Sequence, residues 1–127
     1  MKLRIKGASL RLRLTQGEIQ ALGEQGMIEE RVPFAAHARL VYRLTREAAA
    51  REITASFSDG VVEIHIPEAA ARQWCTSELV TLANEQPVPG GTLRIVLEKD
   101  YACLAPRTDE DESDNYPHPQ AATGKTC

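Results

Sequence analysis

The first fourteen residues constrain the fold more than any other part of the chain. Apolar residues alternate with basic ones over Leu3–Ile5 and again over Leu10–Leu14, on either side of Gly7-Ala8. Period-two alternation around a short connection that contains Gly is typical of a β-hairpin. Its apolar face must be buried by later elements. The opposite face carries five cations and no acid, namely Lys2, Arg4, Lys6, Arg11 and Arg13.

Two helices are expected. Thr15 and Glu18 have the spacing of a capping box, and Gly26 can end a helix in the left-handed conformation, which predicts a helix over about residues 16–25. Pro67 is suited to the start of the second helix, where its missing N–H costs nothing. The apolar spacing of the following residues predicts that this helix ends near Ser77.

Strands are expected between and after the helices. Residues 27–34 indicate a strand whose Pro33 places it at an edge, and Leu40, Tyr42 and Leu44 predict the inward face of the next. Asp59-Gly60 lies between two alternating runs and is the strongest hairpin signal in the chain. Three further segments are expected to be a helical turn or loop, a short strand, and a final strand after a turn-rich loop: 45–52, 79–83 and 93–103.

The fold class expected is α+β, with a curved, mostly antiparallel sheet or a partial barrel and two helices. The length of 127 residues suits one domain, which we expect to end at residue 104, before a flexible acidic tail over 105–127. No internal repeat is apparent. The charge is divided between the ends, since residues 1–46 hold nine cations and four acids, whereas residues 108–127 hold five acids and one Lys.

Composition narrows the cellular setting. Three widely spaced cysteines, Cys75, Cys103 and Cys127, do not resemble a secreted disulfide framework. The chain opens directly on a charged strand rather than a signal peptide, and its apolar runs are too short to cross a membrane. We therefore expect a cytoplasmic protein without a membrane partner.

The chain resembles an uncharacterised family of small bacterial proteins, a domain of unknown function. The segments that carry the resemblance cover nearly the whole chain: Met1–Thr15 (MKLRIKGASLRLRLT), Ile64–Trp74 (IHIPEAAARQW), Glu98–Leu104 (EKDYACL), the acidic run, Asp114–Pro117 and Cys127. The resemblance implies that the tail is part of the design, and it brings no reaction, cofactor or catalytic residue. Where the family pattern leads us to expect Asn, this chain has His118.

Three interpretations of the cationic hairpin face remain open. Lys2, Arg4, Lys6, Arg11 and Arg13 can bind an anionic ligand, can form a solvated face that discourages edge pairing, or can be covered by the chain's own acidic run, 109–114. Interleaved aromatic residues, which are typical of single-stranded nucleic-acid binding, are missing.

A second candidate site involves softer ligands. Cys103, His118 and Cys127 could hold zinc with a carboxylate or water, although their spacing matches no recognised zinc signature. A Cys103–Cys127 disulfide is the other alternative. No Ser, Cys or His lies in a motif that sets catalytic geometry. The sequence therefore favours a non-enzymatic binding or interaction module, with an anionic ligand or a protein as partner and no cofactor. The alternative is a small metal-dependent protein or enzyme that uses Cys103, Cys127 and nearby acids.

Overall fold

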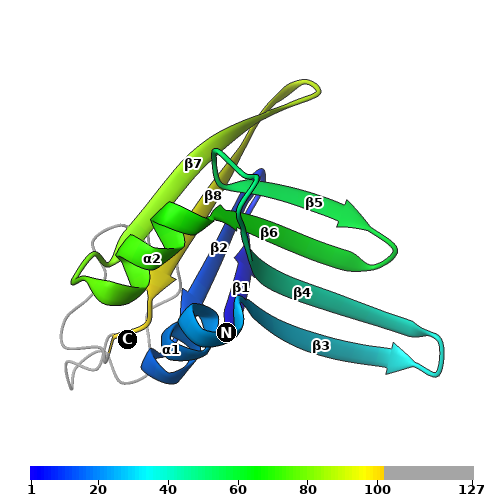
Figure 1. The fold of residues 1–127 in the computed structure, drawn as a ribbon. Helices are drawn as coiled ribbons and strands as arrows, with labels where there is room; N and C mark the ends of the chain where they lie inside the picture. The colour runs from blue at the N-terminus through cyan, green and yellow to red at the C-terminus, as the bar shows by residue number, and fades with distance from the viewer. Residues whose placement is uncertain (102–127) are drawn as a thin grey trace, which may run out of the picture.

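The computed structural model describes residues 1–101, which form eight strands and two helices arranged in two four-stranded sheets (Figure 1). The elements are β1 (Lys2–Ile5), β2 (Ser9–Leu14), α1 (Gln16–Gln25), β3 (Met27–Ala35), β4 (Ala38–Glu47), β5 (Thr54–Ser58), β6 (Val61–Pro67), α2 (Glu68–Thr76), β7 (Thr81–Val88) and β8 (Gly91–Lys99). Sheet A has the order β1-β2-β8-β7, and sheet B has the order β3-β4-β6-β5. The α+β class and the mostly antiparallel pairing are thus confirmed. The strands divide into two curved sheets that do not close into a barrel.

The pattern hairpin, helix, hairpin occurs twice. The first half contains β1–β2, α1 and β3–β4, and the second contains β5–β6, α2 and β7–β8. Each sheet combines one hairpin from each half, joined by a parallel pair at its centre, β2 with β8 and β4 with β6. The structure therefore corrects the expectation that no repeat is present. It also shows that Arg11 and Arg13 on β2 hold positions equivalent to Glu63 and His65 on β6, which likewise alternate with core residues just before a helix.

The inner faces of both sheets and the two helices share one apolar core. Alternate residues of a strand point to opposite faces, so the leucines of β2 enter this core while its arginines point outward. In the view of Figure 1, both helices lie on the near side of sheet A. The core residues that are less than 2% exposed include Trp74, Leu12, Leu14, Leu22, Leu44, Ile64, Ile66, Ile95 and Leu97.

Side chains connect the edges of the two sheets. The Gln86 amide accepts from the Ala55 N–H (2.7 Å) and donates to the Ala55 carbonyl (3.0 Å), which links β7 to β5 as another strand would. On the opposite side, the Tyr42 hydroxyl donates to the Met1 carbonyl (3.0 Å). The ammonium of Met1 pairs with Glu18 and lies 3.3 Å from a carboxylate oxygen of Glu30. These bonds fix sheet A relative to sheet B.

Local signals in the sequence set several element boundaries. The capping box forms as expected, with the Thr15 N–H donating to Glu18 (2.9 Å) and the Glu18 N–H to the Thr15 hydroxyl (3.3 Å). Gly26 ends α1 with φ 80°. Gly60 has φ 76°, and a Cβ there would lie 2.8 Å from the Arg39 carbonyl oxygen, so this turn needs glycine.

Other boundaries differ from the expectation. β4 continues to Glu47, so the first part of 45–52 is strand and no helix forms there. The short strand expected over 79–83 is instead β7, which runs from Thr81 through Pro87 to Val88. Pro87 is tolerated because β7 is an edge strand of sheet A. Phe34 and Phe57, near the hairpin turns, remain 71% and 69% exposed.

Candidate functional site

The outer face of sheet A gathers the cations of the N-terminal hairpin. The β1–β2 register places Lys2 opposite Arg13 and Arg4 opposite Arg11. The parallel register with β8 adds Arg94, which lies beside Ser9. We call these five residues the arginine face: Lys2, Arg4, Arg11, Arg13 and Arg94. Like charges directly opposite each other in neighbouring strands are destabilising, so this arrangement requires compensation.

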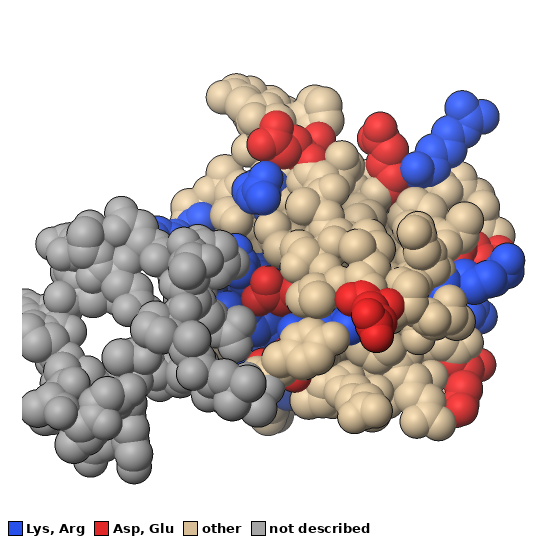
Figure 2. Space-filling model, turned by 90° about the vertical axis from the view of Figure 1, so that its left-hand side faces the viewer, with Lys and Arg blue, Asp and Glu red and all other residues tan. Residues whose placement is uncertain are grey.

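Carboxylates compensate part of this charge. Glu98 on β8 is 6% exposed, and it accepts from Arg11 Nη1 at 3.2 and 3.3 Å and from Arg13 Nε. Lys2 Nζ lies 3.2 Å from Asp100, and Arg94 Nη1 lies 3.8 Å from Glu85. The strands and the residue after β8 thus supply five cations and three acids, an excess of two positive charges. In Figure 2, basic side chains gather along one side of the part that is described, while other charges are scattered.

The arginine face includes four of the five cations expected from the sequence. Lys6 lies at the hairpin turn, where its N–H donates to the Ser9 carbonyl (3.1 Å), and is exposed. Arg94 was missed because nothing local indicates that β8 pairs with β2, 80 residues earlier in the chain. The only signal was its alternation with Leu93 and Ile95. The zinc candidates Cys103, His118 and Cys127 lie outside the described residues.

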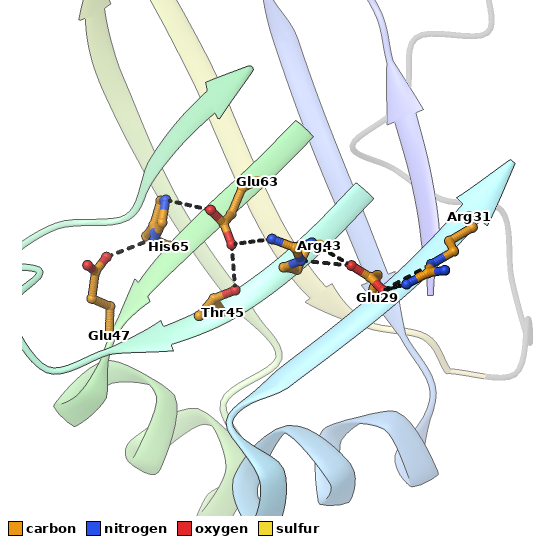
Figure 3. Close-up of polar contacts among 7 residues, drawn as sticks. All are labelled: Glu29, Arg31, Arg43, Thr45, Glu47, Glu63 and His65. Carbon is orange, nitrogen blue, oxygen red and sulfur yellow. Dashed lines mark hydrogen bonds and ion pairs between the residues drawn. The ribbon is translucent and has the colours of Figure 1, made fainter. Parts of the chain in front are cut away.

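The outer face of sheet B carries a different polar network, which crosses β3, β4 and β6 (Figure 3). Arg43 donates to Glu29 (2.6 and 2.9 Å) and to Glu63 (3.2 Å), and Glu63 also accepts from the Thr45 hydroxyl (3.0 Å). Arg31 continues the network from Glu29 at 3.1 and 3.2 Å. Acids and bases alternate along this network, so the charges of sheet B are largely compensated within the face.

His65 occupies the other end of the network. Its Nδ1 lies 2.8 Å from a Glu47 oxygen without the alignment of a hydrogen bond, and its Nε2 lies 3.5 Å from Glu63. Burial opposes ionisation of Glu63, but hydrogen bonds from Arg43 and Thr45 outweigh it and hold the pKa of Glu63 below its ordinary value. The hydrogen bond from Arg43 likewise lowers the pKa of Glu29. Both groups are therefore carboxylates at neutral pH, which suits ion pairing rather than acid catalysis.

The lowered pKa values predict acid sensitivity. A carboxyl whose pKa is depressed on folding stabilises the native state above its ordinary value of 4.5, and this stabilisation is lost as the pH falls through its folded pKa. We expect Glu63→Gln to lower the melting temperature at pH 7 and to make its fall below pH 4.5 shallower than in the wild type. Thermal melts between pH 7 and pH 3 measure both effects. Glu52→Gln, at an exposed loop position, is the control. Parallel pH profiles of Glu63→Gln and the wild type would contradict this account.

A cavity of about 470 Å³ lies where the end of β8 meets the helices. Its lining comprises Leu14, Gln16, Ile19, Cys75, Lys99, Asp100 and Tyr101. Cys75 is a free thiol, and burial raises its pKa, which disfavours the thiolate that a nucleophile or metal ligand needs. Within residues 1–101, no group of three His, Cys, Asp or Glu side chains is placed to hold a metal ion.

Comparisons with known proteins identify a family and no activity. The model of a family described as "Family of unknown function (DUF7009)" matches residues 1–120. No curated protein and no solved structure matches the chain. Neither helix in residues 1–101 is long and apolar enough to cross a membrane.

Proposed function

The chain belongs to this family of unknown function, and we propose that it acts in it as a non-enzymatic binding module whose arginine face takes a ligand with several anionic groups. The observation that carries the proposal is the pairing of like charges in register, Lys2 with Arg13 and Arg4 with Arg11. Such pairs are costly unless an anion lies between or over them. The sheet therefore holds an arrangement that a bound anion would stabilise.

The geometry of a sheet indicates the spacing of the anionic groups. Neighbouring strands lie about 4.8 Å apart, and successive residues on one face of a strand lie about 6.8 Å apart. A ligand that contacts both like-charged pairs thus needs anionic groups separated by roughly 5–7 Å. Guanidinium groups favour phosphate and carboxylate oxygens because their donors form a planar fork. An oligophosphate or a run of carboxylates meets both requirements.

The Glu98 pairs support binding rather than catalysis on this face. Because Glu98 accepts from both Arg11 and Arg13, it fixes their side chains while its single charge leaves the face positive. Preorganised cations lose less conformational entropy when a ligand binds. The equivalent positions on sheet B, Glu63 and His65, lie in a network that alternates in sign, so sheet A is the more favourable surface for an anion.

Binding of inorganic tripolyphosphate, measured by calorimetry at low and high salt, tests the proposal. Lys2→Gln with Arg4→Gln removes two cations from the edge strand without touching the Glu98 pairs. We expect this double variant to bind at least about tenfold more weakly, since one charge-assisted hydrogen bond contributes about 1.5–3 kcal/mol. We also expect wild-type binding to weaken as salt rises, because added ions screen exposed charges.

A matched control removes two cations elsewhere. Arg51→Gln with Arg72→Gln changes the net charge equally at exposed positions in a loop and on α2. The proposal predicts that this control binds tripolyphosphate as the wild type does. Equal losses in the two double variants would instead indicate a response to net charge, and the proposal would then be wrong.

A further inference from the structure

We infer that the acidic run of this chain, residues 109–114, occupies the arginine face and competes there with external anions. The inference rests on the proposed function, because it concerns the same surface. The run contains five acids within six residues: Asp109, Glu110, Asp111, Glu112 and Asp114. The face has an excess of two positive charges among its described residues, so the two segments are complementary in sign.

Burial on the outer face is the first structural support. Val96 and Glu98 point away from the core, since they alternate with Ile95 and Leu97, yet they are only 3% and 6% exposed. Arg11 and Arg13 beside them are 18% and 17% exposed. Both helices lie on the inner side of sheet A, and no helix or strand within residues 1–101 packs over the outer side. A face this well covered without a second layer suits a docked segment.

The path of the chain after β8 is the second support. The Asp100 N–H donates to the Leu14 carbonyl (2.8 Å), and the Asp100 carboxylate lies 3.2 Å from Lys2. The chain thus leaves sheet A beside the ends of β1 and β2, at the border of the arginine face. Nine steps separate Asp100 from Asp109 and span up to about 30 Å when extended. The four strands of sheet A are together about 15 Å wide, so the run can reach every cation.

Tethering makes the run an effective competitor. A short linker holds a segment near its site at an effective concentration of the order of millimolar, so even a weak contact between the run and the face is populated. An external anion must then displace the run before it binds, and its apparent affinity falls. The acidic segment would act as an internal regulator, which yields only to a ligand of higher charge density or at high concentration.

Neutralisation of the run in the full chain tests the inference. The test variant combines Asp109→Asn, Asp111→Asn and Glu112→Gln. The matched control combines Glu24→Gln, Glu52→Gln and Glu78→Gln, which removes three exposed acids elsewhere. We expect the test variant to bind inorganic tripolyphosphate about tenfold more tightly than the wild type, and the control to bind within about twofold of the wild type.

The outcomes separate the inference from the proposed function. If test variant and wild type bind tripolyphosphate equally, the inference is overturned and the proposed function stands. If neither binds, the proposed function is overturned, and amide chemical shifts decide the inference. Shift changes confined to β1, β2 and β8 in the test variant would support docking of the run. Unchanged shifts in those strands would overturn it.

Discussion

Glu98→Gln is expected to destabilise the protein by about 3 kcal/mol, because it removes the carboxylate that Arg11 and Arg13 share. Breaking a buried ion pair at one partner typically costs 3–5 kcal/mol, and the two arginines retain some solvent contact, which lowers the cost. For a domain of about 100 residues, this corresponds to a melting temperature lower by roughly 10–20 °C. Thermal unfolding followed by circular dichroism measures the change.

A second effect of Glu98→Gln distinguishes electrostatics from packing. The substitution raises the positive excess of the arginine face by one charge, so tripolyphosphate should raise the melting temperature of the variant more than that of the wild type. Glu85→Gln, on the same face but 66% exposed, is the control and should change stability by less than about 0.5 kcal/mol. If Glu98→Gln is as stable as the wild type, the carboxylate does not hold the two arginines in place.

The sequence predicted the local elements of this fold well and their arrangement less well. Thr15, Glu18 and Gly26 define α1 through contacts that span a few residues, and Asp59-Gly60 defines a turn in the same way. Both signals are local, so residue types alone reveal them. The parallel pairing of β2 with β8 has no such signal, because it joins segments that are far apart in the chain.

The candidate site shows the same division. Alternation predicted that Lys2, Arg4, Arg11 and Arg13 share one face, and the structure confirms it because period two fixes the side of a strand. The roles of Arg94 and Glu98 depend on strand order, which alternation does not encode. The sequence placed Glu98 as a polar residue between Leu97 and the end of the strand, whereas the structure buries it against two arginines.

The duplicated topology explains why the two outer faces differ while the core does not. At equivalent positions the core keeps apolar residues, such as Leu12 and Leu14 in one half and Ile64 and Ile66 in the other. The outward positions between them are free to vary, and they hold arginines in sheet A but Glu63 and His65 in sheet B. Packing constrains the inner positions, so functional differences between the halves accumulate on the outer ones.

Trp74→Ala is expected to have the largest effect on stability, a loss of about 3–5 kcal/mol. Trp74 on α2 is fully buried within the core that both sheets share, and its indole N–H donates to the Val80 carbonyl (3.0 Å). Replacement by Ala leaves a cavity at the junction of α2 with the sheets and removes this hydrogen bond. A loss of this size is comparable to the total stability of many small domains, so partial unfolding at 37 °C is expected.

Two companion variants make this prediction specific. Trp74→Phe keeps most of the buried ring but loses the N–H donor, so it should cost about 1–2 kcal/mol, intermediate between wild type and Trp74→Ala. Gln73→Ala, at the exposed neighbouring position on α2, should change stability by less than about 0.5 kcal/mol. Circular dichroism is the suitable probe, since the chain has one Trp and the substitution removes its fluorescence. If Trp74→Ala melts with the Gln73→Ala variant, α2 does not anchor the two sheets, and the shared core would have to be held by the inner strand residues alone.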